Sequence, residues 1–144
     1  MFVEKIKNGT VIDHVPVGLG LQIMKILGVD KNYPARVALI MNVASKKMGR
    51  KDVLKVEDKY LDRLSLDRIS LVAPGATINL IKDGDVVEKR ACRMPKIVGG
   101  IMGCPNPKCI TNLERVINTF FVDGSDGRVR CKYCERVFLP DELI

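Results

Sequence analysis

The chain has 144 residues, of which 47% are hydrophobic and 28% are charged. This length suits one ordinary domain or two small ones, and the apolar content is sufficient for a packed core. The sequence contains no run of 18 uncharged apolar residues, and its first residues lack the apolar segment of a secretory signal. We therefore expect a cytoplasmic protein without a membrane span.

The formal net charge of +7 is distributed unevenly along the chain. Residues 1–95 carry a net charge of +6, whereas residues 96–144 carry a net charge of +1. A domain that binds nucleic acid is usually basic itself, because much of its affinity comes from neutralised phosphates. The charge of the first half suits a compact anionic ligand at least as well as a nucleic acid.

The first half alternates strand patterns with helix patterns. Runs of β-branched residues predict strands, and apolar residues at helical spacing predict a first helix that ends at Gly28. Ser65 is the predicted N-cap of a second helix, and Asp83–Gly84 is the predicted turn of a hairpin. The predicted strands are residues 3–6, 10–15, 35–43, 52–58, 76–81 and 86–90, and the predicted helices are residues 18–27 and 65–73.

Without its short first strand, this order contains the βαββαβ arrangement of a ferredoxin-like fold. Residues 93–96 are the predicted junction between two domains, which we place at residues 1–95 and 96–144. In the second domain, strands are predicted over residues 97–102, 114–122 and 129–138. We therefore expect an α+β protein that ends in a small antiparallel β domain of the zinc-ribbon type.

Four of the five cysteines lie in the second domain, in two closely spaced pairs. Cys104 and Cys109 are separated by four residues, and Cys131 and Cys134 are separated by two. Two such pairs on separate hairpins can place four thiolates at the corners of a tetrahedron, which is the arrangement of a closed, structural zinc site. The alternatives are four free buried cysteines or a redox-active pair. Cys92 is interpreted as a structural or incidental thiol.

A domain this small cannot rest on its hydrophobic core alone. Binding of zinc would supply roughly 10–16 kcal/mol of apparent free energy, which would then be folding free energy. We expect one structural zinc ion in each chain, and we expect a chelator to unfold residues 97–144 selectively.

Several polar residues in the first domain form a candidate anion site. Lys51 and Lys55 lie four residues apart and so share one face, and Lys89 and Asn79 lie on the predicted hairpin. Clustered cations of this kind can hold a triphosphate through charge-assisted hydrogen bonds. The alternative is a solvated basic face. Asp13 and His14 are likewise either packing residues or a site for a base or a ribose.

No motif in the sequence predicts catalysis. The phosphate-binding loop, the dinucleotide fingerprint and the His-Glu-x-x-His motif are all missing, and the chain has one histidine. Catalysis by a nucleophile generally requires a base that a third group orients. We therefore expect a chain that is not an enzyme. A zinc-ribbon nucleic-acid binder and a stand-alone small-molecule sensor are the other possibilities, and the near-neutral second domain argues against the first of them.

Four motifs in a fixed order resemble the regulatory chain of aspartate carbamoyltransferase. They are Gly9–Pro16, Met48–Glu57, Ala73–Asn79, and the cysteine pairs within Cys104–Cys109 and Cys131–Glu135. The resemblance implies a non-catalytic chain with an N-terminal allosteric domain and a C-terminal zinc domain that contacts the catalytic chain. It also implies a regulatory homodimer that joins catalytic trimers and controls pyrimidine biosynthesis.

The same resemblance implies that the nucleoside triphosphates CTP, UTP and ATP are allosteric effectors. Asp13 and the segment of residues 3–6 would flank the base, and Lys89 would lie near the ribose and phosphates. Lys51, Lys55 and His14 would lie towards the phosphates or a second nucleotide. The matching positions are Val3, Glu4, Ile6, Val11, Asp13, His14, Lys51, Lys55, Asn79, Ile81, Val86 and Lys89.

Overall fold

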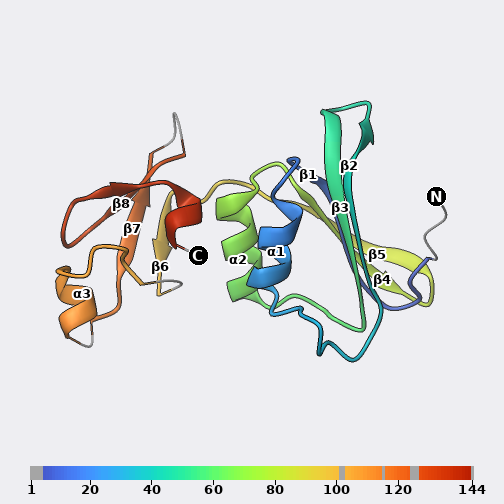
Figure 1. Ribbon diagram of the computed structural model, residues 1–144, viewed down its shortest axis with the longest axis horizontal. Helices are drawn as coiled ribbons and strands as arrows, with labels where there is room; N and C mark the ends of the chain where they lie inside the picture. Colours follow the sequence, from blue (N-terminus) through green and yellow to red (C-terminus); the bar gives the residue numbers. More distant parts are fainter. Residues whose placement is uncertain (1–4, 101–102, 115, 124–126, 144) are drawn as a thin grey trace.

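The computed structural model of the chain describes residues 5–100, 103–114, 116–123 and 127–143. Each half contains one antiparallel sheet, and helices α1 and α2 lie between the two sheets (Figure 1). The first half consists of β1 (Gly9–Val15), α1 (Gly20–Ile26), β2 (Val37–Ser45), β3 (Gly49–Glu57), α2 (Arg63–Val72), β4 (Thr77–Lys82) and β5 (Asp85–Ala91). The second half consists of β6 (Ile97–Gly99), α3 (Ile110–Leu113), β7 (Thr119–Val122), β8 (Val129–Cys131), β9 (Val137–Phe138) and the 3-10 helix η1 (Pro140–Leu143).

The first sheet has the strand order β2-β3-β1-β4-β5, with every neighbouring pair antiparallel. Strands β1 to β4 have the ferredoxin-like order, which confirms the predicted α+β class, and β5 extends the sheet beyond β4. Of the predicted first strand, residues 3 and 4 lie outside the described residues, and Lys5 and Ile6 are not in a strand.

The core of the first half lies between this sheet and helices α1 and α2. Ile12, Leu54 and Ile78 alternate with less buried neighbours along their strands and are at most 2% exposed. They pack with Ile23 of α1 and Ile69 of α2, both completely buried. Because the two helices cover one face (Figure 1), the residues between these core positions point to the opposite face.

The carboxylate of Asp52 is completely buried in this half. It accepts hydrogen bonds from the backbone amides of Gly18 at 3.0 Å, Gly20 at 3.1 Å and Asn42 at 2.9 Å. Asn42 has a φ of 59° at the point where β2 carries one more residue than β3. Asp52, on β3, therefore holds both the start of α1 and the bulge of β2 in place. Strand alternation places Asp52 on the same face as Leu54 and Val56, but a charged residue is not expected to be buried, so the sequence did not single it out.

Helix α2 begins before the predicted position. Its N-cap is Asp62, not Ser65, because the Asp62 carboxylate accepts a hydrogen bond from the Ser65 amide at 2.8 Å. This bond also lowers the pKa of Asp62. Asp62 satisfies the free amide of Ser65 in the first turn, so the helix begins at Arg63, two residues before the predicted start.

The second sheet has the order β6-β7-β8-β9, and its strands are shorter than predicted. The predicted strand over residues 129–138 is divided into β8 and β9 by the turn that carries Cys134. Glu135 adopts a φ of 62° there, and its amide donates to the carbonyl of Cys131 at 2.9 Å. The short helix α3 directly follows Cys109, where the sequence predicted no helix.

The two halves meet at α2. Leu71 of this helix is completely buried and packs in the core of the second half, with Val98, Phe120 and Leu143. Ile69, two residues earlier, belongs to the core of the first half. Helix α2 therefore contributes to both cores. None of the described helices is long and apolar enough to cross a membrane.

Candidate metal centre and basic sheet face

The sulfur atoms of Cys104, Cys109, Cys131 and Cys134 all lie within 4.8 Å of one another. The Sγ atoms of Cys104 and Cys134 are 3.7 Å apart, as are those of Cys109 and Cys131. Four sulfurs at about 2.3 Å from a central zinc ion would be separated by about 3.8 Å in a regular tetrahedron. The cluster therefore fits a tetrahedral ion with four soft ligands. These are the four cysteines that the spacing predicted as ligands.

Two asparagines, which the sequence did not single out, hold the first cysteine pair in place. The side-chain amide of Asn112 donates to the carbonyls of Cys104 at 2.8 Å and Asn106 at 2.7 Å. The buried Asn106 accepts from the amides of Lys108 at 3.1 Å and Cys109 at 3.0 Å. Asparagine is a common turn residue, which is the only signal that the sequence gives for these positions.

The protonation of the four thiols is interdependent. Burial raises the pKa of Cys104 to about 12, and the neighbouring thiols of Cys134 and Cys131 add to the effect. Burial also opposes ionisation of Cys109, but hydrogen bonds from the Thr111 hydroxyl and amide outweigh it and lower its pKa to about 7. Four adjacent thiolates require a cation to offset their mutual repulsion, and a divalent ion would supply that charge.

The fifth cysteine takes no part in this cluster. Cys92 is 5% exposed and packs in the core of the first half. Burial raises the pKa of its thiol. These properties are those of a structural thiol, because the reactive form of cysteine is the thiolate.

On the open face of the first sheet, four predicted site residues form a row across four strands. Val11 of β1 pairs with Lys55 of β3 on one side and with Asn79 of β4 on the other. Asn79 in turn pairs with Lys89 of β5. Directly paired residues share a face of the sheet, so Lys55, Val11, Asn79 and Lys89 form what we call the basic row. In the part of the chain that the structure describes, neither lysine forms an ion pair.

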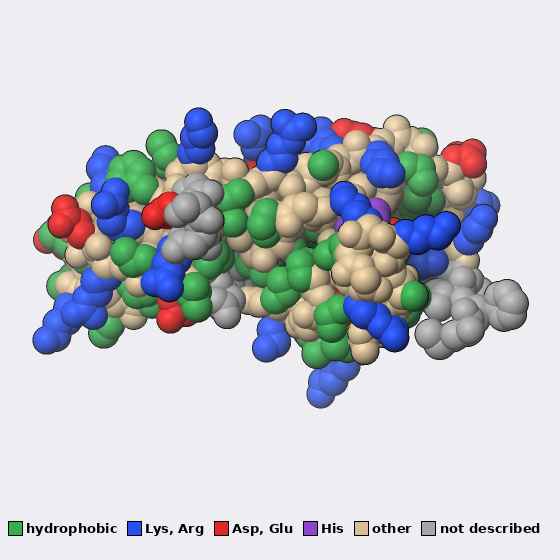
Figure 2. All heavy atoms as spheres, turned by 90° about the horizontal axis from the view of Figure 1, so that it is seen from above, with side chains coloured by type: hydrophobic (Ala, Val, Ile, Leu, Met, Phe, Trp, Pro, Cys, Tyr) green, Lys and Arg blue, Asp and Glu red, His purple; other side chains and the backbone are tan. Residues whose placement is uncertain are grey.

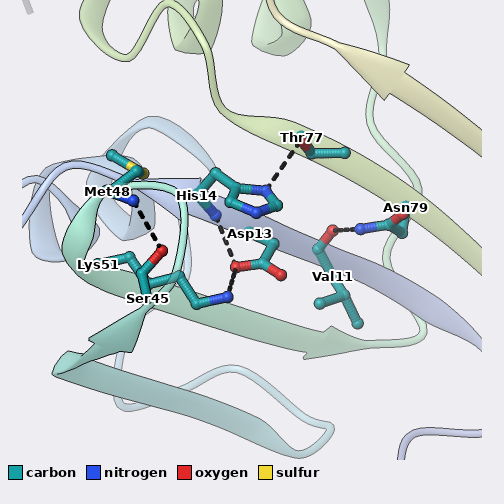
Figure 3. A network of polar contacts seen from close by, with 8 residues as sticks. All are labelled: Val11, Asp13, His14, Ser45, Met48, Lys51, Thr77 and Asn79. Carbon is teal, nitrogen blue, oxygen red and sulfur yellow. Dashed lines mark hydrogen bonds and ion pairs between the residues drawn. The ribbon is translucent and has the colours of Figure 1, made fainter.

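Beside the basic row, Asp13 organises a polar network (Figure 3). Its Oδ1 lies 2.8 Å from Nζ of Lys51 and accepts the backbone amide of His14 at 2.6 Å. His14 has a φ of 56° where β1 has one more residue than β3, and its Nδ1 lies 3.1 Å from the Thr77 hydroxyl. Thr77 was not predicted from the sequence, because only the β1–β4 register places it beside His14.

The ionisation of Asp13 reflects this network. Partial burial raises the pKa of its carboxyl group, but the hydrogen bonds from Lys51 and the His14 amide outweigh burial, and the net shift is downward. Asp13 is therefore held as a carboxylate, and its charge is matched by that of Lys51.

Of the other predicted nucleotide residues, the structure describes Ile6, Ile81 and Val86. Ile6 and Ile81 are both 7% exposed, whereas Val86, on the edge strand β5, is 57% exposed. Val3 and Glu4 lie outside the described residues. The structure thus brings Val11, Asp13, His14, Lys51, Lys55, Asn79 and Lys89 together on one sheet, and it places Val86 further along β5.

The molecular surface is basic over a broad area. Figure 2 shows lysine and arginine side chains along the whole of the surface seen from above, with few acidic groups between them. The positive charge is therefore not confined to the basic row.

Comparison with known proteins assigns both halves to one family. Residues 1–93 match the family described as "Aspartate carbamoyltransferase regulatory chain, allosteric domain". Residues 96–144 match the family described as "Aspartate carbamoyltransferase regulatory chain, metal binding domain". This chain belongs to the aspartate carbamoyltransferase regulatory chain family. The resemblance of its sequence motifs is thereby confirmed, and the chain is a regulatory chain, not a catalytic one.

Individual regulatory chains are similar over their full length. The aspartate carbamoyltransferase regulatory chain of Saccharolobus solfataricus is 47% identical, and the match covers 100% of this chain and 92% of the relative. Those of Pyrococcus horikoshii and Pyrococcus abyssi are 48% and 47% identical, over 99% of this chain and 95% of each relative. The metal binding domain of the family coincides with the part of the chain that holds the four-cysteine cluster.

Proposed function

We propose that this regulatory chain binds the nucleoside triphosphates CTP, UTP and ATP on the open face of its first sheet and transmits their binding to catalytic trimers. The observation that carries the proposal is the basic row, in which Lys55 and Lys89 lie at the two ends of a row across β3, β1, β4 and β5. A polyphosphate is a compact anion that two such lysines can hold.

The Asp13 network gives this face a second recognition element. A carboxylate such as Asp13 can accept a hydrogen bond from a nucleotide base, either from the amino group of cytosine or adenine or from the ring N–H of uracil. Lys51 can bind a phosphate. Because Asp13 and Lys51 are already paired at 2.8 Å, a nucleotide that engaged both would exchange an internal ion pair for two contacts with the ligand. His14 would then lie on the phosphate side of the base.

The second part of the proposal concerns the metal and the domains. We propose that residues 1–95 form the nucleotide-binding domain, and that residues 96–144 form a zinc domain with Cys104, Cys109, Cys131 and Cys134 as ligands. Bound zinc would supply the cross-link that a small β domain lacks. Leu71 of α2 packs in the core of the second half. A movement of α2 caused by nucleotide binding to the sheet would therefore be transmitted to the zinc domain.

The proposed partners are a second copy of the chain and the catalytic trimers. Strand β2 is an edge of the first sheet, which leaves backbone groups for pairing with another chain. The second half exposes Leu113 at 71% and Ile117 at 75%, which suits an apolar contact with a catalytic chain. A role in pyrimidine biosynthesis and a cytoplasmic location belong to the same proposal, since a reducing compartment keeps four thiolates available for zinc.

Calorimetric titration of the full zinc-loaded chain with CTP, UTP and ATP tests the nucleotide site. We expect Lys55→Ala and Lys89→Ala each to weaken binding by about tenfold, because each removes one charge-assisted contact. Lys31→Ala is the matched control, since this exposed lysine lies in the loop after α1 and is not part of the basic row. Equal affinities in all three variants would show that the basic row is not the site.

Size-exclusion chromatography of the chain with catalytic trimers from the same source tests the assembly. We expect a large complex that forms with zinc-loaded protein and is lost after chelation. A zinc-loaded chain that forms no complex with the trimers would reduce the proposal to a nucleotide-binding module.

A further inference from the structure

A hollow of about 610 Å³ lies between helices α1 and α2 and the second half of the chain. Its walls include the apolar side chains of Leu21, Ile26 and Leu143 and the polar side chains of Gln22, Lys25 and Arg68. These residues come from α1, α2 and η1, so both halves contribute to the hollow. Helices α1 and α2, which line the hollow, cover the face of the first sheet opposite the open face that carries the basic row (Figure 1).

The hollow follows from the way the second half packs on the first. The second half contacts α2 through Leu71 and η1. Ile23 of α1 is completely buried against the sheet, but Leu21 is 52% exposed. The side chain of Leu21 therefore forms part of the wall of the hollow, and much of its apolar surface remains in contact with solvent instead of stabilising the fold.

The charged side chains that line the hollow are cationic. Lys25 and Arg68 are cationic, and the lining residues that the structure describes include no aspartate or glutamate. Ligand pockets typically enclose about 300–1,000 Å³ and are often found where two domains meet, with an apolar lining and a few polar groups. We propose that this hollow binds a small amphipathic anion, with its apolar body against Leu21 and Leu143 and its acidic group towards Lys25.

Octanoate, which combines an apolar chain with one carboxylate, is the probe for this site. Titration of the full zinc-loaded chain, followed by calorimetry, should show saturable one-to-one binding. Acetate lacks the apolar body and octylammonium has the opposite charge, so neither should bind at the same concentration. We expect Lys25→Glu to weaken octanoate binding on the order of tenfold, because an attractive charge becomes a repulsive one.

Two further variants separate this site from general surface effects. Leu21→Trp places a larger side chain in the wall of the hollow at an exposed position, so it should abolish octanoate binding without loss of the fold. Lys31→Glu, at an exposed lysine outside the hollow, should leave binding unchanged. Octanoate binding that survives Leu21→Trp, or that octylammonium reproduces, would overturn the proposal, as would the lack of any saturable binding. The nucleotide titrations are independent of either result.

Discussion

The amide of Gly20 donates a hydrogen bond to Oδ2 of the buried Asp52 at 3.1 Å, and the space around Gly20 leaves no room for a side chain. A β-carbon at position 20 would lie 2.9 Å from that oxygen and 2.7 Å from Cδ1 of Leu39. This contact joins the first residue of α1 to the centre of β3. The position of α1 over the sheet therefore depends on a buried carboxylate and on the glycine that approaches it.

Replacement of Asp52 is expected to destabilise the first half strongly. Asp52→Ala leaves three backbone amides without their acceptor, and an unsatisfied buried donor costs about 1–3 kcal/mol. We expect a loss of roughly 3 kcal/mol or more in the free energy of unfolding, measured by urea denaturation. Asp85→Ala, at an exposed acid on β5, is the control and should change stability by less than about 0.5 kcal/mol. Similar losses in both variants would contradict the role of Asp52.

Gly20→Ala should reverse the usual effect of this substitution in a helix. Alanine is normally favoured over glycine by about 1 kcal/mol inside a helix. At position 20 the new methyl group would meet Leu39 and Asp52 within 3 Å, so we expect destabilisation of about 1–3 kcal/mol. Thermal unfolding followed by circular dichroism measures the effect. A variant more stable than the natural chain would show that the contact with Asp52 relaxes without cost.

Each cysteine of the cluster should be required for zinc retention, and Cys92 should not. We expect about one zinc ion per chain in the natural protein and in Cys92→Ser, and almost none in Cys131→Ser, because a tetrahedral site needs all four sulfurs. Metal analysis of the purified variants checks this. After chelation, circular dichroism should show loss of the second sheet with little change in the helices of the first half. Full zinc retention in Cys131→Ser would refute the assignment.

The Asp13–Lys51 pair should make the free energy of unfolding decrease as the pH falls into the acid range. The folded pKa of Asp13 lies below its ordinary value of 3.8, so its contribution to stability is present above pH 4 and is lost as the pH falls through the lowered pKa. Because the pair is partly exposed, we expect the contribution to be below about 1 kcal/mol. Urea denaturation of Asp13→Asn against the natural chain, from pH 6 downwards, should show a difference that disappears in acid. A difference in the free energy of unfolding that increased as the pH fell would contradict this prediction.

Much of the fold follows from local sequence patterns. The alternation in β3 places Leu54 and Val56 in the core, and the motif spacing brings the four cysteines together. The sheet face that carries the basic row could be anticipated in part, because Lys51 and Lys55 must share a face of the strand. The pairing of Val11 with Asn79, and of Asn79 with Lys89, depends on the register of β1, β4 and β5, which local patterns do not contain.

The features that the sequence did not predict arise from contacts between distant segments. Asp52 is a charged residue in an alternating strand, and its burial makes sense only once Gly18, Gly20 and Asn42 turn their amides towards it. The bulge that turns His14 towards Thr77 is likewise a mismatch between two strands.

Leu71 has a consequence for any attempt to divide the chain. A fragment that ends near Pro95 would keep α2 but lose the residues that cover this leucine, and exposure of its side chain would cost about 1.5–3 kcal/mol. Such a fragment would present an apolar spot on the outer side of α2 and would tend to self-associate at high concentration. A soluble truncated form therefore calls for a polar residue in place of Leu71.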